Sequence, residues 1–165
     1  MAVPHSDGSE RVFYSPTRSS LVIGGGQGAD GIIMSAWRRE ALKQLPECRQ
    51  IAENAENPMA LWIELLSACQ KAYARRDQDL IRRFYEFAHW CWRSPSEDVR
   101  TAVACAFYEH LPKTPAMRRD MPRRFGRGAF SELRDLFRYH LSADEAVEFE
   151  REFFEAEKRF VDEIL

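Results

Sequence analysis

Apolar residues recur at every third or fourth position along most of the chain after residue 33. One row joins Leu80, Phe84, Phe87 and Cys91, which is the spacing of one face of a helix. No stretch alternates in the way that strands do. The pattern predicts an all-α protein, a compact antiparallel array of about six to seven helices that is either HEAT-like or an orthogonal bundle. The longer expected helices cover residues 34–45, 58–74, 78–93, 95–110, 129–140 and 143 to near the end.

Residues 84–111 are the expected centre of the core, because they form two apolar helices joined by a short turn. Ser94, Pro95 and Glu97 fit a capping box at this turn. Ser94 would be the N-cap, Pro95 would occupy the first helical position, and Glu97 would reach back. The residues beside the turn would be hard to expose to water: Trp90, Trp92, Val99, Val103 and Phe107.

Other helix starts carry similar signals. Asn57 precedes Pro58, and Thr114 precedes Pro115, so each pair suits a cap followed by the first helical residue. Pro122 is expected to interrupt the short helix that Pro115 begins. Two further starts are expected, one at residues 77–78 and one at a second capping box that pairs positions 142 and 145.

Residues 1–33 differ from the rest, since they are rich in Gly, Ser and Pro and lack a sustained period. They are predicted to form a flexible leader, and residues 34–165 a single helical domain. Gly26, Gly28 and Gly31 make a formal G-x-G-x-x-G. Such a motif binds a dinucleotide only inside a βαβ unit, which the downstream pattern lacks, so a flexible glycine tract is favoured.

Composition narrows the class of protein. The chain has 165 residues, 45% of them hydrophobic and 30% charged, and a net charge of −2, so one folded domain is expected and no overall field favours nucleic acid or membrane. No apolar run suits a membrane span or a signal peptide, which predicts a cytoplasmic protein. The cysteines fall inside apolar helical patterns without close pairs, which favours inert core thiols over zinc ligands or disulfides: Cys48, Cys69, Cys91 and Cys105. No cofactor and no catalytic residue is predicted.

Charge is distributed unevenly near the C-terminus. Six cations and one acid lie within residues 113–127, whereas acids dominate from residue 142 onward. These two segments are expected to face each other or to face water. Arginines interleaved with an aromatic residue can also bind a partner, through phosphates and bases if that partner is a nucleic acid. The candidate partner-binding residues are Arg118, Arg119, Arg123, Arg124, Arg127 and Phe125.

Glu86 and His89 form an E-x-x-H, the spacing that places a carboxylate and an imidazole on one helical face for a metal. The same face carries Arg82 and Arg93, so ordinary ion pairing is the favoured interpretation and metal binding the alternative. Among the tryptophans, Trp92 ends its helix and could border an exposed groove. The other three are interpreted as core residues: Trp37, Trp62 and Trp90.

Asp98, Val99 and Arg100 precede a helical face of small residues, and this element resembles the second helix of a HEAT-type unit. The layout of residues 45–111 also resembles that of uncharacterised bacterial helical domains, some of which are small cytoplasmic partner or immunity-type proteins. The resemblance implies a small cytoplasmic module that binds another protein. The alternatives are a nucleic-acid-associated regulator that uses the basic segment 118–127, and a metal-binding or enzymatic bundle that uses Glu86 and His89.

Overall fold

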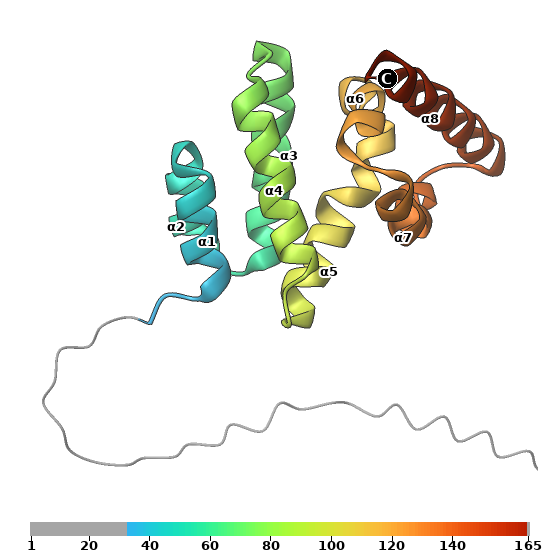
Figure 1. Ribbon diagram of the computed structural model, residues 1–165. Helices are drawn as coiled ribbons and strands as arrows, with labels where there is room; N and C mark the ends of the chain where they lie inside the picture. Colours follow the sequence, from blue (N-terminus) through green and yellow to red (C-terminus); the bar gives the residue numbers. More distant parts are fainter. Residues whose placement is uncertain (1–32, 165) are drawn as a thin grey trace, which may run out of the picture. The chain divides into compact units, whose positions relative to one another are not determined.

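The computed structural model describes residues 33–164 and contains only helices in that range (Figure 1). The all-α prediction is therefore confirmed, whereas the expected six to seven helices become eight α-helices and two short 3₁₀ helices. The α-helices are α1 (Ala36–Gln44), α2 (Arg49–Asn54), α3 (Pro58–Arg75), α4 (Gln78–Trp92), α5 (Glu97–Ala106), α6 (Pro115–Arg124), α7 (Arg127–Arg138) and α8 (Ala143–Ile164). The 3₁₀ helices are η1 (Pro46–Cys48) and η2 (Tyr108–Lys113).

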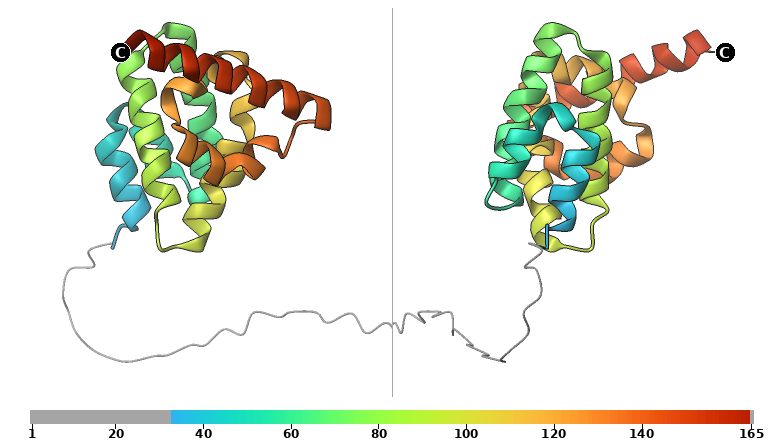
Figure 2. Two further views of the ribbon diagram at one scale, coloured as in Figure 1. Left: turned by 45° about the vertical axis from the view of Figure 1, so that its right-hand side comes forward. Right: turned by 90° about the vertical axis from the view of Figure 1, so that its left-hand side faces the viewer.

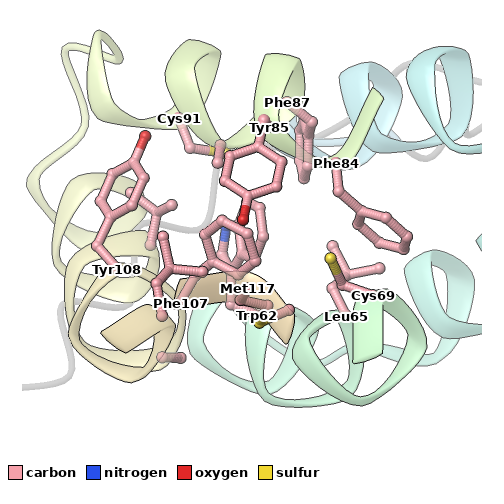
Figure 3. Packing of buried hydrophobic residues seen from close by; sticks show 14 of the residues in the cluster. Trp62, Leu65, Cys69, Phe84, Tyr85, Phe87, Cys91, Phe107, Tyr108 and Met117 are labelled. Atoms are coloured by element: carbon pink, nitrogen blue, oxygen red, sulfur yellow. The ribbon is translucent and has the colours of Figure 1, made fainter. Parts of the chain in front are cut away.

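The core lies between α3, α4 and α5, which pack side by side (Figure 3). Trp62 of α3 is fully buried at its centre. Its ring stacks on Phe87 of α4, with centroids 5.2 Å apart, and lies 4.9 Å from the ring of Phe107. Large aromatic rings dominate the burial of apolar surface here, so these three residues hold the helices together.

The turn between α3 and α4 is closed by local hydrogen bonds. Arg76 ends α3 with φ of 58°, a left-handed conformation, and the Asp77 N–H donates to the carbonyl of Ala72. Asp77 then caps α4, because its carboxylate accepts from the N–H of Leu80 at 3.1 Å. The expected start of this helix is confirmed.

The expected capping box at Ser94 is wrong. α5 begins at Glu97 after Ser96, and the Ser94 hydroxyl accepts a hydrogen bond from the Ser96 N–H at 3.2 Å instead of capping a helix that starts at Pro95. The Arg100 guanidinium donates a hydrogen bond to the Ser94 carbonyl at 2.6 Å. These two bonds hold the segment as a tight turn, which delays the helix by two residues.

The helix expected over residues 95–110 is also shorter than predicted. α5 ends at Ala106, since Phe107 has φ of −129° and ψ of −65°, and the chain continues as the 3₁₀ helix η2. Phe107 and Tyr108 are consecutive and both buried, and the change of helix type lets both rings pack inward. Tertiary packing therefore overrides the local helical pattern.

Pro122 does not end α6, contrary to the sequence-based expectation. The helix passes through Pro122 and ends at Arg124. Met117 and Met121 are fully buried one turn apart on the inner face of α6, so their packing outweighs the hydrogen bond that the proline removes. The start at Pro115 is as predicted, although the Thr114 side chain makes no capping bond.

The last two helices meet through phenylalanine rings, and α8 runs past α6 (Figure 2). Phe130 of α7 lies 4.2 Å from Phe153 of α8. The capping box at the start of α8 is confirmed: the Ser142 N–H donates to the Glu145 carboxylate at 2.8 Å, and the Glu145 N–H donates to the Ser142 hydroxyl at 3.3 Å. Asn57 likewise caps α3 by accepting from the Ala60 N–H at 2.8 Å.

Burial differs from the sequence-based expectation at several residues. Cys105 is exposed, because the inward face of α5 runs through Val99, Val103 and Ala106. Trp37, Trp90 and Trp92 are only partly buried and pack against the core, so Trp37 and Trp90 are not the fully buried residues that were expected.

The predicted leader and its glycine motif lie outside the described residues. In the part that the structure describes, no helix is long and apolar enough to cross a membrane.

Candidate binding grooves beside α6

The structure divides four of the five predicted arginines between two grooves, and Arg127 lines neither of them. Arg118 and Arg119 line a groove between α6 and α8, called the α6–α8 groove. Arg123, Arg124 and Phe125 line a second groove that α4, η2, α6 and α7 enclose, called the α4–α7 groove. The basic segment is therefore not one continuous surface, because α6 contributes a wall to each groove.

The α6–α8 groove has a volume of about 670 Å³ and an apolar floor. Phe149 and Phe153 lie at its base and are almost fully buried. The other apolar lining residues are Pro115, Pro122, Ala156 and Phe160. Charged side chains complete the lining: Arg118, Arg119, Glu152 and Arg159.

Ion pairs join the basic segment to α8. Arg118 pairs with Glu152 at 2.8 Å and lies over the ring of Phe149 at 5.3 Å. Arg127 pairs with Glu157 at 2.7 Å. Lys113 pairs with Glu145, near the start of α8, at 3.0 Å. For these cations the expectation that the basic and acidic segments face each other is confirmed.

Three other arginines of this region have no carboxylate partner among the side chains that the structure describes: Arg119, Arg123 and Arg159. Arg119 and Arg123 are exposed. The Arg123 guanidinium lies over the Phe160 ring, with its Cζ 4.6 Å from the ring centroid. Two of the predicted partner-binding arginines thus remain available to an external anion, whereas Arg118, Arg124 and Arg127 are paired within the chain.

The α4–α7 groove has a volume of about 430 Å³ and is walled by aromatic rings. Tyr85, Trp92, Tyr108 and Phe125 line it. Phe125 itself is buried, 5.7 Å from the Tyr85 ring and 6.1 Å from the Tyr108 ring, so it supports the wall instead of offering an exposed contact. The lining also contains polar residues: Arg82, Glu86, His89, Arg93, Arg123, Arg124 and Glu132.

A partly buried chain of hydrogen bonds fixes one side of this groove. The Tyr85 and Tyr73 hydroxyls lie 3.0 Å apart, the Tyr73 hydroxyl donates to Asp120 at 2.8 Å, and Arg124 donates to the same carboxylate at 2.7 Å. Arg124 also donates to Gln78 at 3.2 Å. Burial raises the pKa of Tyr73 and of Tyr85, so both hydroxyls keep their protons and act as donors in this chain.

On the opposite side, the Trp92 indole N–H donates to Glu132 at 2.7 Å, and Arg93 donates to the same carboxylate at 3.1 Å. Trp92 therefore borders a groove, as its position at the helix end suggested. Tyr108 lies at one edge of the core cluster (Figure 3) and is only 2% exposed. Burial raises the pKa of its hydroxyl.

Glu86 and His89 line the α4–α7 groove together with the basic residues that follow Pro122. Glu86 is already engaged, since Arg82 donates to it at 2.6 Å. Within residues 33–164, no group of three or more His, Cys, Asp or Glu side chains could hold a metal ion. The E-x-x-H spacing therefore coincides with an ordinary ion pair on an exposed helical face.

Sequence patterns gave no signal for several residues that shape the grooves. Tyr108 and Glu132 come from η2 and α7, and Arg159 from α8, so none of them lies on α6. Only tertiary contacts bring them beside α6. The alternation of charged and apolar residues indicates which face of its helix each of these residues occupies. It does not indicate which residues of another helix lie beside it.

A family model described as a domain of unknown function, DUF7674, matches residues 38–139. The chain belongs to this family. All residues that line the α4–α7 groove lie inside the matched DUF7674 region, whereas six of the ten residues that line the α6–α8 groove come from α8, beyond it. No curated protein and no solved structure matches the chain.

Proposed function

We propose that this member of the family is a protein-interaction module, and that its α6–α8 groove binds an amphipathic helix with acidic residues beside its apolar face. The observation that carries the proposal is an apolar floor, formed by Phe149, Phe153 and Phe160, beneath arginines that lack a carboxylate partner among the described residues. A helix laid into such a groove buries its apolar face, while charged residues at the rim select its partner.

The charges at the rim favour an acidic partner. Arg119 and Arg159 line the groove, and Arg123 reaches Phe160 from the end of α6. Glu152, the acid of the same lining, is neutralised by Arg118. A partner with Asp or Glu on both sides of its apolar stripe would pair with these rim arginines at little desolvation cost, since they are solvent-accessible.

A nucleic-acid-associated role is the second candidate and would use the same arginines. Pairing within the chain neutralises Arg118, Arg124 and Arg127, so fewer cations remain for phosphates than the sequence suggested. The protein partner is therefore favoured. Antiparallel packing of α3 on α4, with α5 beside them, supports the HEAT-like interpretation. That interpretation stays a prediction, as do the immunity-type role, the bacterial source and the cytoplasmic location.

The test is a selection from a displayed library of short amphipathic helices whose polar faces are acidic, basic or neutral. The full chain is expected to enrich acidic helices, and the double variant Arg119→Glu with Arg159→Glu to lose this preference by about tenfold or more in affinity. Both residues lie at a solvent-accessible rim, so charge reversal leaves the core intact.

The matched control reverses two exposed cations on α1 and α2, Lys43→Glu with Arg49→Glu, which gives the same change in net charge away from the groove. This control should bind the acidic helices with a loss well below that of the double groove variant. Selection of basic helices, or equal loss in both double variants, contradicts the proposal. Retention of DNA or RNA by the full chain, abolished by the groove variant, would favour the second candidate.

A further inference from the structure

A third groove lies between α2 and α3 and is called the α2–α3 groove. It has a volume of about 600 Å³ and shares no lining residue with the α6–α8 groove or the α4–α7 groove. All of its lining lies inside the region that the family model matches. The helix-binding proposal makes no use of this groove, so the two surfaces can be tested separately.

Apolar side chains of two helices border a hollow in the α2–α3 groove. Ile51 of α2 is partly buried, and Ile63 of α3 is 57% exposed. Ala55 and Ala60 also line the groove and contribute only methyl groups, which leaves room beside the larger side chains. An apolar side chain of a partner that entered this space would remove surface of both isoleucines from water.

The charges in the lining of this groove are negative. Glu56 and Glu64 are exposed, and neither forms an ion pair with any side chain that the structure describes. By contrast Glu53 of α2, which does not line the groove, is paired with Arg49 at 3.0 Å. No lysine or arginine is among the described residues that line the groove. Charge complementarity therefore favours an occupant that carries positive charge.

The end of α2 adds to this preference for a cation. The last carbonyl groups of a helix carry a partial negative charge. The chain already places one guanidinium at this end of α2, because Arg38 of α1 donates to the Ala52 carbonyl at 3.0 Å and also to the Ala55 carbonyl. Ala55 is a lining residue of the groove, so a bound arginine already lies at its border.

We propose that the α2–α3 groove binds a short cationic segment of a partner protein, which places an apolar side chain beside Ile51 and Ile63 and lysine or arginine side chains beside Glu56 and Glu64. Both carboxylates are exposed, so pairing them costs little desolvation. Exposed ion pairs contribute little to affinity one by one. The apolar contact therefore supplies most of the affinity, and the charges select the partner.

The probe for this site is a short blocked peptide of leucine, alanine and lysine whose leucines lie on one helical face. It is titrated into the full chain while the isoleucine methyl signals are followed by NMR, with Ile51 and Ile63 assigned from the loss of each signal in a valine variant. Both signals are expected to shift until saturation, whereas the signal of Ile81, which is buried in the core, stays unchanged. The same peptide with every lysine replaced by glutamate should bind the groove about tenfold or more weakly.

Two variants locate the peptide. Glu56→Gln with Glu64→Gln keeps the size of both side chains and removes their charges, so the lysine peptide should bind about three- to tenfold more weakly. Ile63→Ser removes an exposed apolar contact and should weaken binding by about threefold or more. The matched control, Asp135→Asn with Asp144→Asn, makes the same change in net charge at exposed acids of α7 and α8 and should bind as the parent chain does.

Three results overturn the proposal: no saturable shift of the Ile51 and Ile63 signals in the parent chain, equal binding of the lysine and glutamate peptides, or unchanged affinity in both groove variants. A shift of the same two signals when the protein alone is concentrated would show that a second copy of the chain covers the groove, which also overturns the proposal. None of these outcomes bears on helix binding in the α6–α8 groove, whose test uses Arg119 and Arg159.

Discussion

The Tyr73 hydroxyl donates a hydrogen bond of 2.8 Å to the carboxylate of Asp120, which joins α3 to α6 across 47 positions of the chain. A tyrosine hydroxyl has one proton to donate, so the neighbouring Tyr85 hydroxyl, 3.0 Å away, must donate to Tyr73. Arg124 completes the chain at Asp120. Core packing and the wall of the α4–α7 groove are therefore connected by one set of polar contacts.

Tyr73→Phe should lower the free energy of unfolding by about 1–2 kcal/mol, because it removes a partly buried hydrogen bond and leaves the Tyr85 hydroxyl without its acceptor. Urea unfolding followed by circular dichroism measures the change. Tyr139→Phe is the matched control, since Tyr139 is 70% exposed and its hydroxyl contributes no comparable bond. Equal stability of the two variants would show that the polar chain is not stabilising.

Stability should fall at alkaline pH. Burial raises the pKa of Tyr73, Tyr85 and Tyr108 above the ordinary value of 10.0, so above that pH the unfolded chain loses protons that the folded chain retains. The contribution of these residues is fully present below pH 10 and declines as the pH rises further. Unfolding free energies measured across this range should show the decline, and Tyr108→Phe should make it shallower. A flat profile would contradict the burial of these hydroxyls.

Glu145 should titrate at unusually low pH. The Ser142 backbone N–H, then the Lys113 ammonium, and then the Ser142 hydroxyl lower the pKa of its carboxyl to about 2. The stabilisation is present above the ordinary value of 4.5 and is lost as the pH falls towards 2. Titration followed by the side-chain NMR signals of Glu145 measures the midpoint. Lys113→Met should raise the midpoint part of the way, and a midpoint near 4.5 in the parent chain would argue against the capping box in solution.

Arg76→Gly should stabilise the protein by about 0.5–1 kcal/mol. Arg76 has φ of 58°, a conformation that is unfavourable for a residue with a Cβ and favourable for glycine at the end of a helix. Its side chain is exposed and has no acidic partner among the described residues, so little is lost with it. Thermal unfolding measures the gain, and Arg75→Gly, one position earlier inside α3, should destabilise instead. A loss of stability in Arg76→Gly would count against the left-handed helix end.

Signals that act within one turn of chain were predictable from the sequence. Asn57 and the Ser142–Glu145 pair cap the helices that they were expected to cap, because donor and acceptor lie only three residues apart. The expectation for Ser94 failed because α5 begins two residues later than predicted, after Ser96, while the Ser94 carbonyl accepts a hydrogen bond from Arg100.

The grooves could not be predicted in this way. Tyr108 was expected to continue a regular helix, and only the break at Phe107, which core packing imposes, places its hydroxyl in the α4–α7 groove. The blocks of opposite charge left two outcomes open, that the basic segment faces α8 or that each segment faces water, and the first holds for Lys113, Arg118 and Arg127. Which arginines would be left without a partner depends on the crossing of two helices, and local patterns carry no information about such a crossing.

α6 forms a wall of both grooves, with Pro122 on one side and the consecutive Arg123 and Arg124 on the other. Any movement of α6 towards α8 narrows one groove and widens the other. By thermodynamic reciprocity, an occupant that shifts α6 changes the affinity of the second groove, and the second occupant changes that of the first by the same factor. A single ten-residue helix is thus the element through which the two surfaces would be coupled.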